Sequence, residues 1–154
     1  MIGYLSQNSV EELFRQWSEY DPNIQSYGFG ELYNQNGEPK VEQKYPGFWA
    51  QPLNTQVEEY VLVRNYQILI YDLQFDNTNL VISDCEEIAF RLIRFLKGRS
   101  DIFYISGTPT VSPFVDRFLD DVAGVIIDLS IEFNAESSDC EDPDYNFIFK
   151  QNNI

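Results

Sequence analysis

The sequence of 154 residues contains no histidine, which removes the usual general base of catalysis and the commonest zinc ligand. It contains only two cysteines, and they lie in very different contexts. Cys85 falls within an expected helix, and Cys140 falls in an acidic segment near the end of the sequence. We therefore expect no disulfide between them, and their spacing fits no metal site.

Basic residues are also scarce. The chain has 10 Lys and Arg against 25 Asp and Glu, which gives a formal net charge of −15. The cations are scattered, and only the stretch Arg91–Arg99 is locally basic. Because a phosphate-binding groove needs clustered cations, the composition disfavours sequence-specific binding to nucleic acid and binding to an anionic membrane surface.

Long hydrophobic runs are missing. No run approaches the roughly 18 apolar residues that a membrane span requires, and the first residues lack the basic region and apolar core of a signal peptide. We expect a soluble protein that is made and kept in a cytoplasm. The length predicts one domain over residues 1–135, followed by an acidic tail over residues 136–154 that ends in an aromatic segment.

Two stretches have the pattern of long strands. Tyr60–Phe75 is rich in β-branched and aromatic residues and contains neither glycine nor proline. Val122–Phe133 alternates between apolar and polar residues. We expect these two strands at the centre of a sheet whose apolar face is covered by helices. The fold class expected is α+β, with a single mixed or antiparallel sheet and about two helices packed on one face. The apolar positions of the second strand are Val125, Ile127, Leu129, Ile131 and Phe133.

Two helices are predicted, one from Ser9 to about Tyr20 and one from about Ser83 to Lys97. Each begins with Ser-x-x-Glu, the pattern of a capping box in which the serine and the glutamate satisfy each other's backbone amides. The pair Asp21-Pro22 should end the first helix, and Gly98 should supply a left-handed C-cap to the second.

Each helix leaves one alternative open. The apolar stripe of the first helix suits the core, but it would also suit an arm that docks on a neighbouring copy. The basic end of the second helix complements the negative helix terminus, but it could also contact an acidic partner.

The segments between the first helix and the strand Tyr60–Phe75 are less regular. Ile24–Tyr33 is a predicted strand weakened by two glycines, and residues 34–45 form a hairpin or an extended loop. Phe48–Pro52 reads as a short strand with a proline at each end, which confines it to a sheet edge or an entry position. Leu53–Glu59 is expected to be a connection.

The segments after the second helix include one ambiguous stretch. Asp101–Ser106 is a predicted short strand, and Gly107–Pro113 is a predicted loop. Phe114–Asp121 is either a helical turn or the outer part of a long bent strand.

The end of the sequence combines an acidic segment with an aromatic one. Glu136–Asp144 carries several carboxylates and is expected to be solvated. Tyr145–Phe149 is aromatic and aliphatic, so it either adds onto another surface or packs back on its own domain.

Carboxylate chemistry is the remaining catalytic possibility. Two acids can hydrolyse a glycoside if they face each other across a gap of roughly 5–10 Å. The doublets Asp120–Asp121 and Glu58–Glu59 adjoin strand starts, but adjacent strand residues point to opposite faces. The acidic tail lacks a calcium-binding loop pattern, and there is no phosphate-binding or nucleophile motif. We therefore expect no catalytic, cofactor-binding or metal-binding residues, no cofactor and no enzymatic activity.

Three passages and the order of elements resemble the tail-terminator and tail-completion (neck) proteins of tailed bacteriophages. The passages are Tyr66–Leu73 with the turn Asp76–Asn79, Val81–Ala89 at the helix start, and Pro113–Gly124 before the last strand. In particular, the chain is similar to versions from phages of Bacteroidetes-type hosts, in which such a stretch precedes an alternating strand and a late cysteine, here Cys140. The resemblance covers about residues 45–140.

The resemblance implies a structural virion protein that forms a homo-oligomeric ring at the neck. This ring would end tube polymerisation and join the tail to the connector; alternatively, the chain would be another connector or neck ring protein. Such rings are typically hexameric, while neighbouring connector rings are often dodecameric. The expected partners are further copies of the chain, the tail tube protein and the head-tail connector. DNA would pass through the lumen without specific binding, because an acidic wall repels phosphates. Assembly would take place in the host cytoplasm.

Two alternatives come from other classes. A DNA-mimic inhibitor would present carboxylates in phosphate-like arrays, but here the acids are interspersed with apolar strand positions and concentrated in the tail. A carboxylate-dependent hydrolase would need two acids from distant segments to face one cleft.

Overall fold

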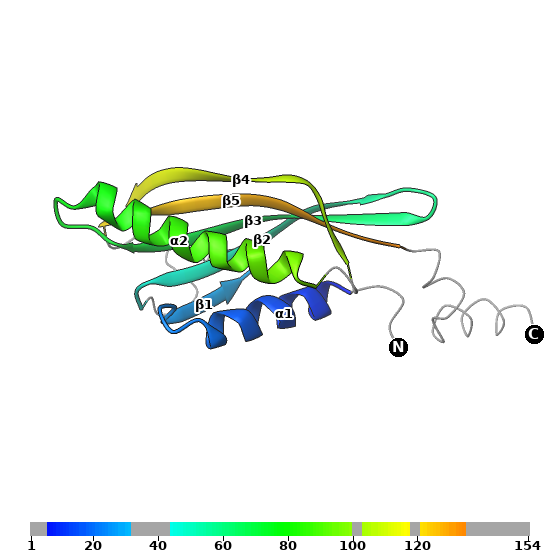
Figure 1. Ribbon diagram of the computed structural model, residues 1–154, viewed down its shortest axis with the longest axis horizontal. Coiled ribbons are helices and arrows are strands. Elements are labelled where there is room, and N and C mark those ends of the chain that lie inside the picture. The colour runs from blue at the N-terminus through cyan, green and yellow to red at the C-terminus, as the bar shows by residue number, and fades with distance from the viewer. Residues whose placement is uncertain (1–5, 32–43, 100–102, 118–120, 135–154) are drawn as a thin grey trace, which may run out of the picture.

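The computed structural model describes residues 6–31, 44–99, 103–117 and 121–134. These residues form a single five-stranded sheet with two helices packed on one of its faces (Figure 1). The strand order is β1-β2-β3-β5-β4; β1 and β2 are parallel, and the other neighbours are antiparallel. The expected α+β fold with one mixed sheet is therefore confirmed.

The centre of the sheet is formed by the two strands that the sequence pattern singles out. β3 (Val61–Leu73) and β5 (Asp121–Asn134) pair without interruption from Val61↔Asn134 to Leu73↔Val122. The apolar alternation of β5 is confirmed, since all five of its predicted core residues are buried against the helices. Periodicity thus identifies both the strands and the face that the helices cover.

Helix α1 (Gln7–Tyr20) begins earlier than its predicted capping box. The N-cap is Ser6, whose Oγ accepts a hydrogen bond from the amide of Ser9 at 3.1 Å, so Ser9 lies inside the helix. The prediction of Ser9 as the cap was wrong because Ser6 stands three residues before it and offers the same side-chain oxygen. The predicted end at Asp21 is confirmed, and Val10, Phe14 and Trp17 are buried as the stripe indicated.

Helix α2 (Thr78–Lys97) also begins earlier than predicted, at Thr78 after the N-cap Asn77. Ser83 lies inside the helix, so the second capping box was also wrong. The additional turn is stabilised by Val81, which is buried on the same face as Cys85. Gly98 follows the helix as predicted, but its φ of −70° and ψ of −8° are right-handed, so the expected left-handed cap was also wrong.

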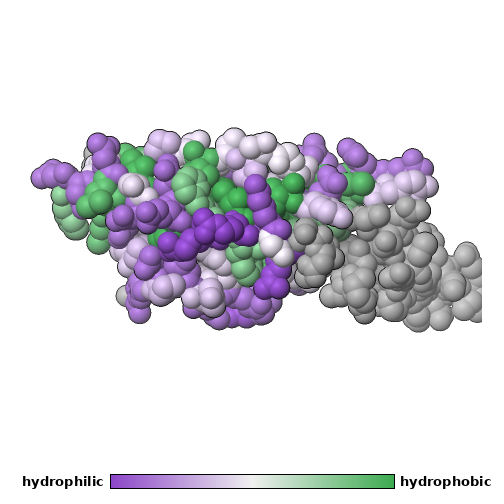
Figure 2. All heavy atoms as spheres, in the orientation of Figure 1, coloured by the Kyte–Doolittle hydropathy of each residue, from purple (hydrophilic) through white to green (hydrophobic). Residues whose placement is uncertain are grey.

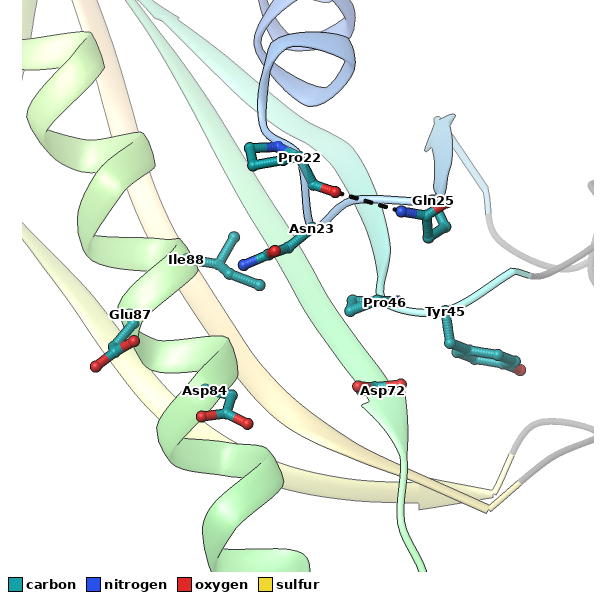
Figure 3. Close-up of a pocket in the computed structure, with 9 residues that line it drawn as sticks. All are labelled: Pro22, Asn23, Gln25, Tyr45, Pro46, Asp72, Asp84, Glu87 and Ile88. Atoms are coloured by element: carbon teal, nitrogen blue, oxygen red, sulfur yellow. Dashed lines mark hydrogen bonds between the residues drawn. The ribbon is translucent and has the colours of Figure 1, made fainter.

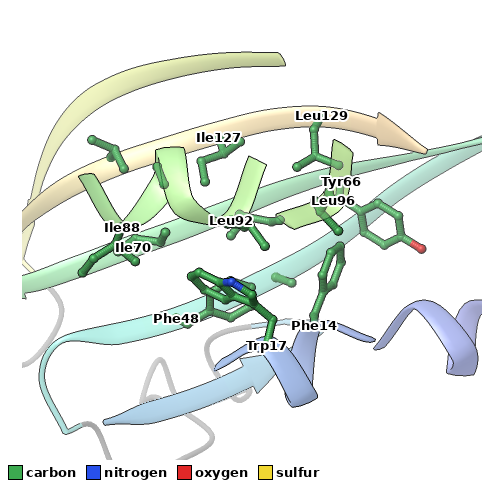
Figure 4. Packing of buried hydrophobic residues seen from close by; sticks show 14 of the residues in the cluster. Phe14, Trp17, Phe48, Tyr66, Ile70, Ile88, Leu92, Leu96, Ile127 and Leu129 are labelled. Carbon is green, nitrogen blue, oxygen red and sulfur yellow. The ribbon is translucent and has the colours of Figure 1, made fainter. Parts of the chain in front are cut away.

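The core lies between the two helices and the sheet, and it is rich in aromatic rings (Figure 4). Phe14 packs edge-on against Tyr66, with ring centroids 5.2 Å apart, and Trp17 packs on Phe48 at 5.7 Å. Helix α2 covers β3, β5 and β4, with Leu92 and Leu96 fully buried. Since truncating a buried phenylalanine costs roughly 3–5 kcal/mol, these contacts supply much of the stability of the fold.

Strand β2 (Gly47–Val57) is longer than the predicted short edge strand, and it lies between β1 (Ser26–Phe29) and β3. The prediction that Pro52 ends the strand was wrong. An irregularity in the register between Pro52 and Thr55 absorbs the proline, and pairing with β3 resumes as far as Val57↔Leu62. The predicted connection Leu53–Glu59 is therefore mostly strand. Of the predicted strand Ile24–Tyr33, only Ser26–Phe29 is strand, and residues 32–43 lie outside the described part.

Strand β4 (Tyr104–Arg117) includes the end of the predicted short strand, the whole predicted loop and the first four residues of the ambiguous stretch; residues 101–102 and 118–120 lie outside the described part. The prediction of a loop over Gly107–Pro113 was wrong. For Phe114–Arg117, the described residues that follow it in β4, the reading as the outer part of a long strand is the one observed. Because β4 pairs only with β5, its prolines do not interrupt a second ladder. A register shift between Ser106 and Thr110 accommodates Gly107 at a φ of +66°.

Candidate interaction surfaces

The β2–β3 hairpin extends well beyond the helices at one end of the sheet (Figure 1). Its inner half carries buried residues, whereas every residue from Leu53 to Tyr60 is exposed. Three of these are large hydrophobic residues: Leu53 is 55% exposed, Val57 75% and Tyr60 49%. These apolar side chains are only partly covered by their own domain, so they are available to a partner surface.

Cross-strand contacts hold this arm in shape. Asn65 Nδ2 donates to the Asn54 side-chain oxygen at 3.1 Å and to its backbone carbonyl at 3.3 Å. Arg64 donates from Nη1 to Thr55 Oγ1 at 3.3 Å, and its guanidinium lies 5.7 Å from the centroid of the Phe133 ring. The outer half of the hairpin is therefore tied to β5 at its base.

The acids Glu58 and Glu59 lie in the turn at the tip of this hairpin. Both are exposed, and the amide of Glu58 donates to the carbonyl of Val61 at 2.9 Å. Of the other predicted doublet, Asp121 begins β5 and accepts from Gln74 Nε2 at 2.9 Å. Asp120 lies outside the described residues. The described acids of the two doublets are therefore placed at a hairpin tip and at a strand start, and the structure does not bring them together.

The face of the sheet opposite the helices carries a second, smaller apolar cluster. Tyr71 is fully buried and Trp49 is 2% exposed, and each ring lies where a neighbouring glycine leaves room. A Cβ added at Gly47 would lie 2.5 Å from the ring of Tyr71, and one added at Gly28 would lie 2.0 Å from the ring of Trp49. The indole Nε1 donates to the Gly30 carbonyl at 2.8 Å. These glycines let large rings lie flat along the sheet.

A pocket of about 600 Å³ opens between the first part of α2, the end of β3 and the segments that precede β1 and β2 (Figure 3). Its acidic residues are Asp72 from β3 and Asp84 and Glu87 from α2. The remaining lining residues are Pro22, Asn23, Gln25, Tyr45, Pro46 and Ile88. Sequence reasoning did not group these three acids, because they come from two elements and share no spacing pattern.

Electrostatics in this region disfavour further negative charge. Burial raises the pKa of Asp72, a hydrogen bond from the Leu73 amide lowers it, and the charge of Asp84 raises it. Burial also raises the pKa of the neighbouring Cys85 thiol to about 12, with smaller contributions from Asp72 and Asp84. In the described part of the chain, no three Asp, Glu, Cys or His side chains are grouped as metal ligands would be.

Neither α1 nor α2, the helices of the described residues, is long and apolar enough to span a bilayer. The sequence matches no protein-family model and none of the curated proteins with which it was compared. The structural features of the chain itself therefore carry the functional argument.

Proposed function

We propose that this protein is a structural virion protein of a tailed bacteriophage. It assembles into a ring at the head-proximal end of the tail, where it ends tube polymerisation and joins the tail to the connector. The observation that carries the proposal is the outer half of the β2–β3 hairpin, which extends beyond the helices and exposes Leu53, Val57 and Tyr60. The phage setting rests on the sequence resemblance over about residues 45–140.

The described surface suits contacts between copies better than a reaction on a small substrate. Apolar residues exposed on the hairpin would be buried against a neighbouring subunit, and about 25 cal/mol per Å² of apolar area removed from water would favour the contact. In a closed ring each subunit uses one surface to contact the next and a different surface to receive the previous one. A projecting hairpin at one end of the sheet provides such an asymmetric contact. The net charge of −15 would give the ring an acidic wall that does not hold DNA.

Native mass spectrometry and negative-stain electron microscopy of the purified chain test this function. We expect closed rings, of six subunits or alternatively twelve, to form as protein concentration and salt increase. The neutral double variant Val57→Ser/Tyr60→Ser should remain monomeric while its circular dichroism is unchanged, because both side chains are exposed. The matched control is Phe75→Ser/Tyr104→Ser, which removes two rings that are 77% and 60% exposed elsewhere.

Two results would contradict the proposal. One is a wild-type chain that stays monomeric at every concentration, even with purified tail tube protein present. The other is a hairpin variant that forms rings as readily as the wild type. A monomer that captures a restriction or DNA-repair enzyme would favour the DNA-mimic alternative instead.

A further inference from the structure

A second hollow lies between the two helices, away from the acidic pocket. This interhelix groove has a volume of about 450 Å³ and is formed by α1 and the end of α2. Its lining residues are Gln16, Trp17, Tyr20, Phe95 and Arg99. Trp17 is only 3% exposed and forms part of the core, whereas Tyr20 is 83% exposed and stands at the groove as an uncovered ring. The exposed Tyr20 and the half-buried Phe95 together give the groove a solvent-accessible aromatic surface.

One cation, Arg99, lines the groove. The Arg99 guanidinium lies 4.8 Å from the centroid of the Phe95 ring, so the charge is held over the aromatic surface. Arg94 and Lys97 occupy the exposed last turn of α2. Within the described residues, none of these three cations forms an ion pair. In a chain with net charge −15, this is a localised positive surface.

The chain carries a segment of complementary chemistry. Glu136–Asp144 contains five acids, and Tyr145–Phe149 directly follows it. In an extended peptide alternate residues share a side, so Tyr145, Phe147 and Phe149 would present three rings to one surface. The order along the chain is an acidic part followed by an aromatic part. The groove offers the same two features, a cation (Arg99) and aromatic side chains.

The geometry places this segment within reach of the groove. Strand β5 ends at Asn134, and two residues earlier Glu132 pairs with Tyr104, the first residue of β4. The adjacent residue Phe103 donates from its amide to the Arg99 carbonyl at 3.3 Å. The end of β5 and the end of α2 therefore lie at the same end of the molecule (Figure 1). The ten residues 135–144 can extend up to ~33 Å. This length is enough to connect the end of β5 with the groove at the end of α2.

We infer that the interhelix groove is a docking site for the segment Tyr145–Phe149 of the same chain. The aromatic side chains cover Tyr20 and Phe95, and the acidic spacer lies along Arg99. The contact concerns a single chain, so it can succeed or fail separately from ring assembly. Figure 2, in the orientation of Figure 1, shows that the region around α1 is mostly hydrophilic.

Paramagnetic relaxation tests this docking in the full chain. Cys140 lies within the acidic spacer, while Cys85 is only 1% exposed, so a nitroxide reagent labels Cys140 selectively. We expect the label to broaden the amide signals of Tyr20 and Arg99 and the indole signal of Trp17. The broadening should be lost in Phe147→Ser/Phe149→Ser and in Tyr20→Ala, and increasing salt should weaken it, because the ion pairs are exposed.

A control and a mixing experiment complete the test. Phe75→Ala removes an exposed ring outside the groove and should leave the broadening unchanged, while the unlabelled variants should keep the wild-type amide spectrum elsewhere. When spin-labelled chain without ¹⁵N is mixed with unlabelled ¹⁵N chain, we expect no broadening. Absent broadening in the labelled wild type, or broadening that arises only in the mixed sample, would overturn docking within one chain.

Discussion

The guanidinium of Arg91 donates two hydrogen bonds to the carboxylate of Asp21, from Nε to Oδ2 at 2.9 Å and from Nη2 to Oδ1 at 3.2 Å. Asp21 is the C-cap of α1 and is only 4% exposed, while Arg91 comes from the middle of α2. The same carboxylate accepts from the amide of Asn23 at 3.0 Å. One buried acid thus ends the first helix, forms the following turn and fixes the second helix beside it.

Removing this cation should destabilise the fold. In Arg91→Met the stem is kept but the buried carboxylate loses its partner, so we expect the free energy of unfolding to fall by about 1–3 kcal/mol. The matched control is Arg15→Met, whose partners Glu12 and Glu19 are exposed, and its expected loss is much smaller because solvent screens an exposed ion pair. Urea unfolding measures both, and Asp21→Asn combined with Arg91→Met should recover part of the loss. Equal losses in the free energy of unfolding of Arg91→Met and Arg15→Met would contradict the prediction, because the buried pair would then stabilise the fold no more than the exposed one.

Gly124 should tolerate no side chain. A Cβ at this position would lie 1.9 Å from the carbonyl oxygen of Ile70 and 2.7 Å from the Cα of Tyr71, both atoms of the backbone of β3. Because the central strands cannot separate without breaking their ladder, Gly124→Ala should cost about 3 kcal/mol or more, or prevent folding. Gly98→Ala is the control: its φ of −70° suits alanine, and its nearest contact is the Phe95 carbonyl at 3.3 Å. We expect the control to change the stability by less than about 1 kcal/mol. A thermal melt of Gly124→Ala within a degree of the wild type would contradict this packing.

Asp72 should make stability depend on pH in an unusual direction. Burial raises its pKa above the ordinary value of 3.8, so the folded chain holds this proton more tightly than the unfolded chain. The stabilising contribution is therefore complete below the unfolded pKa and is lost as pH rises through the higher folded pKa. Asp72→Asn should consequently raise the melting temperature at pH 7 and have little effect at pH 3.

The control for this prediction is Asp128→Asn, which changes the net charge equally from an exposed strand position. Asp84→Asn should give a smaller gain at pH 7, because it removes the charge that raises the Asp72 pKa. Thermal unfolding followed by circular dichroism at both pH values measures all three variants. A lower melting temperature for Asp72→Asn at pH 7 would show that the carboxylate stabilises the fold.

The thiol of Cys85 should be inert in the folded protein. It is 1% exposed, and burial raises its pKa to about 12, so the reactive thiolate is scarce at neutral pH. In Cys140→Ser, a chromogenic disulfide reagent should therefore release no colour until guanidinium unfolds the chain, and then one equivalent. Fast labelling of the native variant would mean that α2 opens locally.

Ring formation should increase with salt. Six copies at −15 each would carry −90 formal charges, and charges more than roughly 8–10 Å apart are largely screened at physiological ionic strength. Light scattering of the wild type between low and moderate sodium chloride should show a rising mass. The hairpin variant Val57→Ser/Tyr60→Ser has the same charge and should show no such rise.

The central strands and the helical stripes could be predicted from sequence because burial imposes a period on them. Val125 to Phe133 alternate as a strand requires, and Val10, Phe14 and Trp17 recur as a helix requires. The helix starts were missed because Ser-x-x-Glu also occurs inside helices. The second helix begins before its predicted start at Ser83, because Val81 packs into the core as part of an additional first turn.

The long hairpin and the edge strand were missed for a different reason. Pro52, Pro109 and Pro113 are local signals for a strand end or a loop, and only the position within the sheet shows that each is tolerated. The acidic pocket could not be predicted at all, since Asp72 and Asp84 meet only because β3 and α2 pack together. The sequence pattern predicts a connection over Leu53–Glu59, whereas this segment forms most of the exposed outer half of the β2–β3 hairpin on which the functional proposal rests.

The outermost strand β4 has a consequence for how copies of this chain can aggregate. An edge strand of 14 residues presents unpaired backbone N–H and C=O groups, with which the edge strands of further molecules could pair without limit, as in a fibril. Proline at position 113 lacks the amide hydrogen that such pairing needs, and the offset near Ser106 bends the strand. Open-ended growth by strand pairing at this edge is thereby disfavoured.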